Sequence, residues 1–152
     1  METSQGARLA LLLLDGFNVL VDEVVKELEL QGHPGVTVTH EFALTAIDEG
    51  ADSASALGRR LGVSKQAAAK TIAALEQLGY VERALSPSDA RRKQLRVTTR
   101  GYEMTVIGGA KFDELRNRWA AALEPLQVAA VEAALFQLTG HEPRPIPPLG
   151  TA

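Results

Sequence analysis

The sequence predicts a mainly α-helical protein that carries one small β-hairpin. Apolar residues recur at helical spacing over most of the chain, and turn residues such as Gly62 and Gly79 divide the helical stretches. Two short runs, "YVERAL" and "KQLRVT", are typical of strands and flank the turn-rich segment "SPSDARR". With 152 residues, 45% of them hydrophobic, the chain is long enough to bury one substantial core, so we expect one domain.

The first predicted helix spans Leu9 to Gln31 and has an unusually broad apolar face. A stripe of apolar residues at positions i, i+4, i+8, i+11 and i+15 is formed by Leu13, Phe17, Val21, Val24 and Leu28. Three more apolar residues widen it, namely Leu14, Leu20 and Val25. A face this wide needs more than one partner surface. The turn "GHPG" ends the helix, and a second helix is expected from Thr37 or Thr39 to Glu49.

Two further helices lie close together in the middle of the chain. Ser53 can cap the short helix "ASALGRRLG", and Gly62 supplies the left-handed residue after its last turn. Ser64 can cap the next helix, in which Ala68, Ile72 and Leu75 share one side. Two helices joined by three or four residues that include a glycine predict a helix-turn-helix.

The predicted hairpin follows directly, which gives the order of a winged helix-turn-helix over residues 37–99. Thr98 or Thr99 can cap a long helix from Arg100 to about Leu123, in which Gly108-Gly109 marks a bend or a close crossing. Pro125 suits the first turn of a last helix that ends before Gly140. Residues 141–152 contain four prolines, so we expect a disordered or extended tail.

Charge is distributed unevenly along the chain. The net charge is −7 over residues 1–50, +6 over residues 51–100 and −2 over residues 101–152, and five of the sixteen basic residues lie between Arg91 and Arg100. A cationic middle third favours a surface that meets a polyanion, although a solvated basic face would have the same composition.

The composition also excludes several function classes. Without cysteine the chain has no disulfide, thiolate metal site or cysteine nucleophile. His33, His40 and His141 are scattered, and His40-Glu41 lacks the spacing of metal ligands, so we expect no metal site, no cofactor and no enzyme. A metal sensor that uses His40 and nearby carboxylates is the weaker alternative. The run "LALLLL" follows an acidic leader and is too short to span a membrane, so we expect a cytoplasmic protein without a membrane partner.

The residue types in the middle third suit double-stranded DNA. The predicted helix 64–78 would enter the major groove, with Ser64 and Lys65 at phosphate and Gln66 at adenine. The hairpin 84–96 would place Arg91, oriented by Asp89, in the minor groove. The full set of expected contacts comprises Ser64, Lys65, Gln66, Ala67, Ala69, Lys70, Asp89, Arg91, Arg92, Lys93 and Arg96. A solvated hairpin edge is the alternative for the wing cations.

The core "LGVSKQAAAKTIAALEQLGYVERALSPSDARRKQLRVTTRGYEM" resembles the multiple-antibiotic-resistance regulator (MarR) family. The family pattern is matched by Ser64, Leu75, Gly79, Val81, Arg83, Pro87, Asp89, Arg91, Thr98 and Gly101. Two positions depart from it, because Val97 stands where leucine is usual and Ala90 replaces the first of two wing arginines. The resemblance covers about residues 53–104.

The resemblance implies a bacterial transcriptional regulator, expected to be a repressor, which binds a palindromic operator as a homodimer. Residues 8–36 and 100–140 would form the dimerisation layer, and their apolar faces exceed what one winged domain could cover. It also implies a small aromatic effector, for which the candidate residues are Phe17, His40, Phe42, Tyr80 and Trp119; core packing is the alternative for each. The rival function is a winged-helix module that binds protein and does not read DNA.

Overall fold

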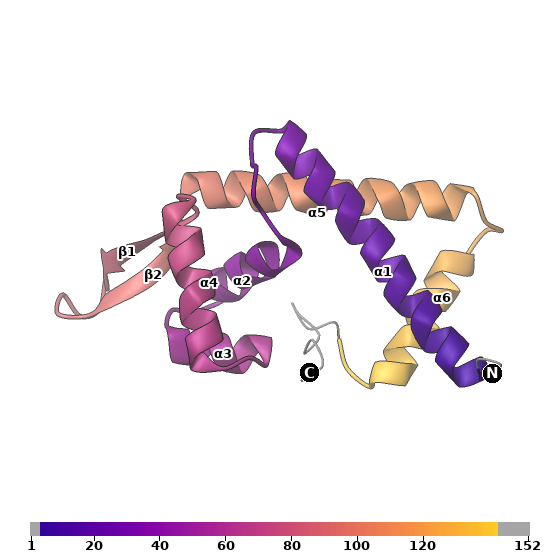
Figure 1. The fold of residues 1–152 in the computed structure, drawn as a ribbon, viewed down its shortest axis with the longest axis horizontal. Helices are drawn as coiled ribbons and strands as arrows, with labels where there is room; N and C mark the ends of the chain where they lie inside the picture. Colours follow the sequence, from indigo (N-terminus) through magenta and orange to yellow (C-terminus); the bar gives the residue numbers. More distant parts are fainter. Residues whose placement is uncertain (1–3, 143–152) are drawn as a thin grey trace.

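The computed structural model describes residues 4–142, which form six helices and one two-stranded antiparallel sheet (Figure 1). The elements are α1 (Gln5–Leu30), α2 (Val38–Asp48), α3 (Ala54–Leu61), α4 (Lys65–Gln77), β1 (Val81–Leu85), β2 (Lys93–Val97), α5 (Thr99–Ala121) and α6 (Gln127–Thr139). This confirms a mainly α-helical fold with one small hairpin. None of the helices in this part of the chain is long and apolar enough to cross a membrane.

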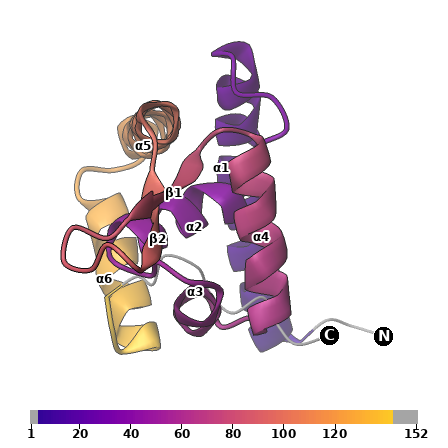
Figure 2. The ribbon, with the colours of Figure 1, turned by 90° about the vertical axis from the view of Figure 1, so that its left-hand side faces the viewer.

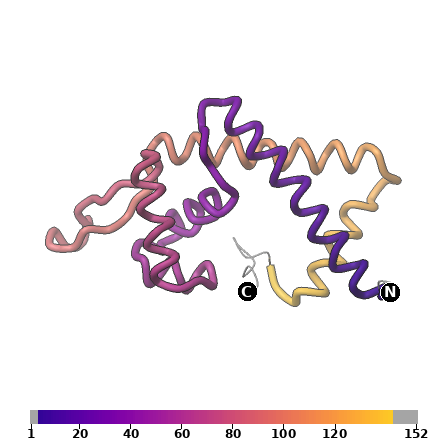
Figure 3. The backbone as a smooth tube through the Cα atoms, in the orientation of Figure 1, coloured from indigo at the N-terminus to yellow at the C-terminus, as the bar shows by residue number. Residues whose placement is uncertain are grey.

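The long helix α5 connects two ends of an elongated molecule (Figures 1 and 3). The short helices α2, α3 and α4 and the hairpin gather at one end, and α6 lies at the other. Helix α1 packs across α5, and α3 packs against α4. The view from the hairpin end shows that α4 and the hairpin both lie at this end (Figure 2), where α4 contacts β1.

One hydrophobic core holds the winged end to the long helices. Its largest fully buried side chains are Tyr80, Leu28, Leu44, Leu57, Leu61, Leu75, Met104 and Val24. These residues come from α1 to α5, so the core spans the helix-turn-helix and both long helices. Burying each such side chain stabilises the fold by about 1.5–3 kcal/mol.

The helix-turn-helix has the caps that the sequence predicts. The Ser53 hydroxyl accepts a hydrogen bond from the Ala56 amide at 3.1 Å, and Gly62 ends α3 with φ at 67°. Gly58 is required by the close approach of the next segment, because a Cβ there would lie 3.0 Å from the Val63 carbonyl oxygen. Backbone sterics therefore fix the angle between α3 and α4.

The hairpin is short and its register is regular. Val81 faces Val97, and Leu85 faces Lys93, at the two ends of the ladder. Val81, Leu95 and Val97 are buried, whereas the tip at residues 87–92 is exposed. The Ser86 amide donates to the Arg92 carbonyl at 2.8 Å and closes the tip. The wing is thus anchored at its base and presents its tip to solvent.

The structure differs from the sequence predictions in the outer helices. Helix α1 begins at Gln5, because Ser4 caps it with a hydrogen bond from the Ala7 amide. Helix α6 begins only at Gln127, because Leu126 adopts a left-handed conformation with φ at 73°, so Pro125 precedes the helix. The predicted tail lies outside the described residues from 143 onward.

The glycine pair in α5 marks a close crossing. A Cβ on Gly108 would lie 2.7 Å from the carboxyl carbon of Glu41 on α2, whereas a Cβ on Gly109 would meet open space. Glycine at 108 therefore lets α2 approach the backbone of α5. Of the two alternatives in the sequence analysis, the structure has the close crossing at Gly108.

Candidate DNA-binding surface

Helix α4 presents the predicted reading residues to solvent. Its inner side buries Ala68, Ile72 and Leu75, which hold it against the core. Its outer side exposes all six predicted contact residues, namely Ser64, Lys65, Gln66, Ala67, Ala69 and Lys70. The helical period separates these two sets, so packing the apolar stripe turns the polar and small residues outward.

The amino terminus of α4 is suited to an anion. The Ser64 hydroxyl accepts a hydrogen bond from the Ala67 amide at 3.1 Å and caps the helix. The first turn carries no acidic residue, and it begins with Lys65 and Gln66. The positive end of the helix dipole is therefore reinforced by a cation and not neutralised.

Asp89 organises the wing tip through the backbone. Its carboxylate accepts a hydrogen bond from the Arg91 amide at 3.0 Å, and its carbonyl accepts one from the Arg92 amide at 3.1 Å. We expected Asp89 to pair with the charged group of Arg91, but this carboxylate forms no ion pair among residues 4–142. An aspartate that bonds the amide two residues on stabilises a tight turn, so it orients Arg91 by fixing the chain.

The wing cations fall into two groups. Arg92 lies 3.4 Å from an Asp52 carboxylate oxygen, and Arg96 lies 2.7 Å from that of Glu82. Arg91 and Lys93 are exposed and form no ion pair with any described residue. Exposed pairs contribute only about 0–1 kcal/mol, so Arg92 and Arg96 can exchange their carboxylates for phosphates.

A set of unpaired cations therefore lies on α4 and the wing. Within residues 4–142, Lys65 and Lys70 also form no ion pair, and both lie on the outer side of α4. The net charge of +6 in the middle third is thus concentrated at the hairpin end of the molecule. Neighbouring cations without carboxylate partners make this end attractive to a polyanion.

Arg100 has an internal contact that the sequence analysis did not foresee. Its guanidinium donates to the Leu78 carbonyl at 3.3 Å and to the Gly32 carbonyl at 3.1 Å, and it lies 5.1 Å from the centre of the Tyr80 ring. Arg100 keeps its charge but is held by the fold, so the other four cations between Arg91 and Arg100 make up the wing. The planar donors of arginine serve two carbonyls at once here.

Two of the effector candidates, Tyr80 and Trp119, lie far apart within one chain. Tyr80 is fully buried next to Gly101 at the start of α5, whereas Trp119 is 50% exposed near the end of that helix. Eighteen residues of helix separate these ends by about 27 Å, so the two side chains do not share one small cavity. Phe17 and Phe42 are half-buried, and Phe42 packs on the core.

His40 has a local structural contact. Its Nδ1 atom accepts a hydrogen bond from the Thr37 amide at 3.2 Å, which completes a capping box at the start of α2. Burial lowers the pKa of this imidazole, which favours the neutral ring that this bond requires. No group of three or more potential metal-ligating side chains occurs in the described part of the chain.

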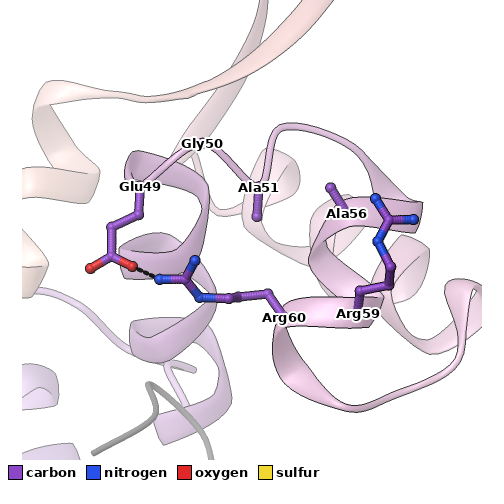
Figure 4. Close-up of a pocket in the computed structure, with 6 residues that line it drawn as sticks. All are labelled: Glu49, Gly50, Ala51, Ala56, Arg59 and Arg60. Carbon is purple, nitrogen blue, oxygen red and sulfur yellow. Dashed lines mark hydrogen bonds and ion pairs between the residues drawn. The ribbon is translucent and has the colours of Figure 1, made fainter. Parts of the chain in front are cut away.

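An open depression lies between α2 and α3 (Figure 4). Its lining residues are Glu49, Gly50, Ala51, Ala56, Arg59 and Arg60. Arg60 forms an ion pair with Glu49 across the depression, while Arg59 forms none with the residues described. None of the effector candidates lines this depression. In the sequence, only the adjacent arginines Arg59 and Arg60 could have indicated it.

Two buried polar groups were also missed by the sequence analysis. The carboxyl of Glu41 is 7% exposed, and its Oε2 atom has no hydrogen-bond partner among the described residues. Burial raises the pKa of Glu41 to about 7. The imidazole of His33 is 4% exposed, and its Nδ1 atom lies 2.9 Å from the Tyr80 hydroxyl. No sequence pattern distinguishes such groups from surface residues.

Comparisons with known proteins agree with this geometry. The family model described as "MarR family" matches residues 34–92. A curated relative, the HTH-type transcriptional regulator BilQ of Clostridioides difficile (strain CD3), is 47% identical over 57 residues, which is 38% of this chain and 36% of that protein. The chain thus matches only about a third of the length of this relative.

Solved structures share the fold over nearly the whole chain. Streptococcus pneumoniae FabT, solved in complex with DNA, has a TM-score of 0.68 at 20% identity, covering 88% of this chain and 94% of that one. CouR from Rhodococcus jostii RHA1, solved bound to p-coumaroyl-CoA, has a TM-score of 0.64 at 21% identity, covering 90% and 95%. At this identity the likeness concerns the fold.

Over residues 34–92 the description of the family model and the printed name of the curated relative agree with the class predicted from the sequence, a transcriptional regulator. The match includes the turn between the helices, the whole of α4 and the wing up to Arg92. The helices outside it have the order and fold of solved MarR-family structures. The winged helix-turn-helix region of this chain, residues 34–92, therefore belongs to the MarR family.

Proposed function

We propose that this protein is a cytoplasmic, homodimeric repressor of transcription that binds a palindromic DNA operator. Residues 64–78 lie in the major groove and the wing 84–96 reaches the minor groove beside it. The proposal rests on four exposed cations of α4 and the wing, namely Lys65, Lys70, Arg91 and Lys93. None of them forms an ion pair with a residue that the structure describes. The relative FabT, solved in complex with DNA, supports it.

The contacts divide into those that read bases and those that hold phosphates. Gln66 has the amide that pairs with an adenine edge, and the methyl groups of Ala67 and Ala69 allow close approach. Lys65 and the amino terminus of α4 hold a phosphate, and Lys70 contacts guanine or phosphate. Arg91 enters the minor groove, while Arg92, Lys93 and Arg96 follow the backbone.

The dimer is formed by the helices outside the winged region. Leu9, Leu12 and Leu14 of α1 are 54%, 58% and 53% exposed, and Phe136 and Leu138 of α6 are 47% and 68% exposed. Both sets lie at the end of the molecule opposite the hairpin (Figure 1). Exposed apolar surface on this scale favours an interface, and residues 8–36 and 100–140 supply it in the proposed dimer.

A small aromatic effector releases the protein from its operator in this proposal. CouR was solved with p-coumaroyl-CoA, which contains an aromatic group. Within one chain Tyr80 and Trp119 lie too far apart to share a pocket, so the site draws on Phe17, His40 and Phe42 near α1 and α2. A ligand that binds one dimer geometry better than another shifts the spacing of the two reading helices.

Selection of bound duplexes from random DNA tests the reading function. A palindrome with half-sites about 34–36 Å apart is expected, because paired helices of a dimer meet successive turns of one face. A selection that returns no common sequence, together with capture of a protein by the same surface, would instead support the winged module that binds protein.

The salt dependence of binding tests the individual contacts. Lys65→Ala and Lys93→Ala should each reduce the slope of log K against log salt by about 0.9, the value for one phosphate contact on duplex DNA. Gln66→Ala should change base preference and leave this slope unchanged. Lys26→Ala, which removes an exposed lysine of α1, is the matched control. An unchanged slope in both wing and helix variants would contradict the proposed arrangement.

Sedimentation at micromolar concentration tests the dimer. Leu12→Glu introduces a charge into the exposed apolar surface of α1 and should yield monomers. Leu85→Glu makes the same change at a 62% exposed leucine of β1, outside the proposed dimerisation layer, and should remain dimeric. A wild-type protein that sediments as a monomer at this concentration would overturn the dimeric arrangement.

A further inference from the structure

Three segments of the chain that lie far apart in sequence meet at one polar cluster, in which two buried rings contact the exposed side chain of Arg100. The cluster consists of His33 in the turn after α1, Tyr80 in the turn after α4, and Arg100 in the first turn of α5. Tyr80 is fully buried and His33 is 4% exposed. The cluster thus lies where the reading helix joins the two long helices of the proposed dimerisation layer (Figure 1).

The two buried rings are joined directly. The Nδ1 atom of His33 and the hydroxyl of Tyr80 lie 2.9 Å apart, and the ring centres are 5.6 Å apart. The turn that carries His33 is itself held, because the His33 amide donates to the Leu28 carbonyl at 2.8 Å. The position of the Tyr80 ring is therefore set by the end of α1.

Arg100 and Thr98 join the carboxyl end of α4 to α5. Arg100 donates to the Leu78 carbonyl at 3.3 Å, and Thr98 donates through its hydroxyl to the Gly79 carbonyl at 2.6 Å. The other branch of the Arg100 guanidinium reaches the Gly32 carbonyl at 3.1 Å, in the turn after α1. The carbonyls just after the end of α4 are thus bonded by side chains at the start of α5, namely Arg100 and the cap residue Thr98.

We propose that His33, Tyr80 and Arg100 are positioning residues for DNA reading, because they bind the carboxyl end of α4 to α1 and α5 and so set the direction in which its amino terminus points. This inference rests on the proposed DNA-reading function of α4. None of the three residues touches DNA in this arrangement. They act through α4, whose first turn carries Lys65 and Gln66.

The displacement of the first turn of α4 can be worked out by treating the helix as a rigid rod that rotates about its carboxyl end. Helix α4 has 13 residues, so its amino terminus lies about 20 Å from the cluster, and a rotation of about 10° there moves the first turn by about 3 Å. A displacement of this size exceeds the tolerance of a hydrogen bond to a base edge. Loss of the bonds in the cluster therefore weakens hydrogen bonds to bases more than it weakens the electrostatic attraction to phosphates.

The polar bonds, and not only the packing, are needed for this role. Tyr80→Phe removes a single hydroxyl and keeps the buried ring. His33→Ala removes the imidazole, whereas His33→Asn keeps a group that can bond the Tyr80 hydroxyl. Rescue by asparagine therefore separates a directional bond from general stability.

A measurement without DNA tests the positioning itself. The chain has no cysteine, so Lys26→Cys on α1 and Ala69→Cys on α4 introduce the only two attachment points for spin labels, and both sites are exposed. With labelled protein diluted into unlabelled protein, Tyr80→Phe and His33→Ala should shift or broaden the distance distribution by about 2 Å, because Ala69 lies about 14 Å along α4 from the cluster and a rotation of about 10° moves it by that amount. His33→Asn should restore the wild-type distribution.

Binding to the selected duplex supplies the second measurement. Tyr80→Phe and His33→Ala should each weaken specific binding by about 2- to 10-fold, with the double variant no weaker than either one, because both remove the same bond. The salt slope should be unchanged, unlike that of Lys65→Ala, because no phosphate contact is lost.

The two measurements separate the two proposals. An unchanged label distribution in folded Tyr80→Phe and His33→Ala proteins overturns the positioning role, whatever the protein binds. A failure of the wild-type protein to bind any selected duplex, with the label distribution shifted as expected, overturns the reading function and leaves the mechanical coupling supported.

Discussion

Replacing Glu41 by glutamine is expected to stabilise the protein at alkaline pH and to have much less effect at acid pH. The carboxyl of Glu41 lies at the crossing of α2 and α5 against Gly108, and its Oε2 atom has no partner among the described residues. An ionised carboxylate in such a site has lost its hydration without compensation. Glutamine has nearly the same shape and carries no charge.

The magnitude follows from the pKa of Glu41, which burial raises from 4.5 to about 7. A raised pKa means that the folded state binds the proton more tightly than the unfolded state does. The stability from this group is therefore fully present below pH 4.5 and is lost as pH rises through about 7. The difference of about 2.5 units corresponds to about 3 kcal/mol at pH 8.

Urea unfolding of the wild-type and Glu41→Gln proteins at fixed concentration between pH 4.5 and pH 8 measures this effect. The free energy of unfolding of the variant, minus that of the wild type, should rise by about 3 kcal/mol across this range. Glu29→Gln, at an exposed position on α1, is the matched control for loss of a carboxylate. A difference that stays constant with pH would refute the assignment of a buried, unpartnered carboxyl.

Three other predictions concern single sites. Gly101→Ala should destabilise the protein by about 3 kcal/mol in thermal or urea unfolding, because the new Cβ would lie 2.5 Å from the Tyr80 carbonyl oxygen and 2.6 Å from a methyl of Val97. Gly109→Ala, in open space on the same helix, should stabilise it by up to about 1 kcal/mol; equal effects would contradict the packing described. Ser53→Ala should cost about 1 kcal/mol through loss of the α3 cap, and no loss in urea unfolding would mean that the cap is unimportant. Burial lowers the pKa of His33, Arg100 lowers it further, and Glu103 raises it. The stability contributed by the neutral imidazole is therefore present above pH 6.5 and is lost as the pH falls. His33→Asn should reduce this loss of unfolding free energy at acid pH, measured by urea unfolding at a series of pH values.

The order and boundaries of the elements in the winged region could be predicted from the sequence. Ser53 and Ser64 cap the helices that the sequence assigned to them, Thr98 is the one of two candidates that caps α5, and Gly62 has the predicted left-handed conformation. These features depend on contacts within a few residues of the chain, which local sequence determines. The exposure of the predicted reading residues follows from the same source, because the helical period fixes which side of α4 is apolar.

The effector candidates could not be judged in this way. Tyr80, His40 and Trp119 are all aromatic, and the sequence gives each the same reason to line a pocket. The structure makes Tyr80 a core residue, makes His40 part of a cap and leaves Trp119 half-exposed at the far end of α5. Their separation depends on the path of a long helix, which no local pattern reports.

The sequence by itself thus determined the caps of the winged region, the helical faces and the cationic middle third, since each is a property of neighbouring residues. Tertiary structure alone decided that Asp89 holds the wing through the backbone, that Glu41 is buried against Gly108, and that Arg100 bonds inward. The physical reason is that desolvation and hydrogen bonding between distant segments depend on which surfaces meet, and side chains of the same type experience opposite environments once the chain has folded.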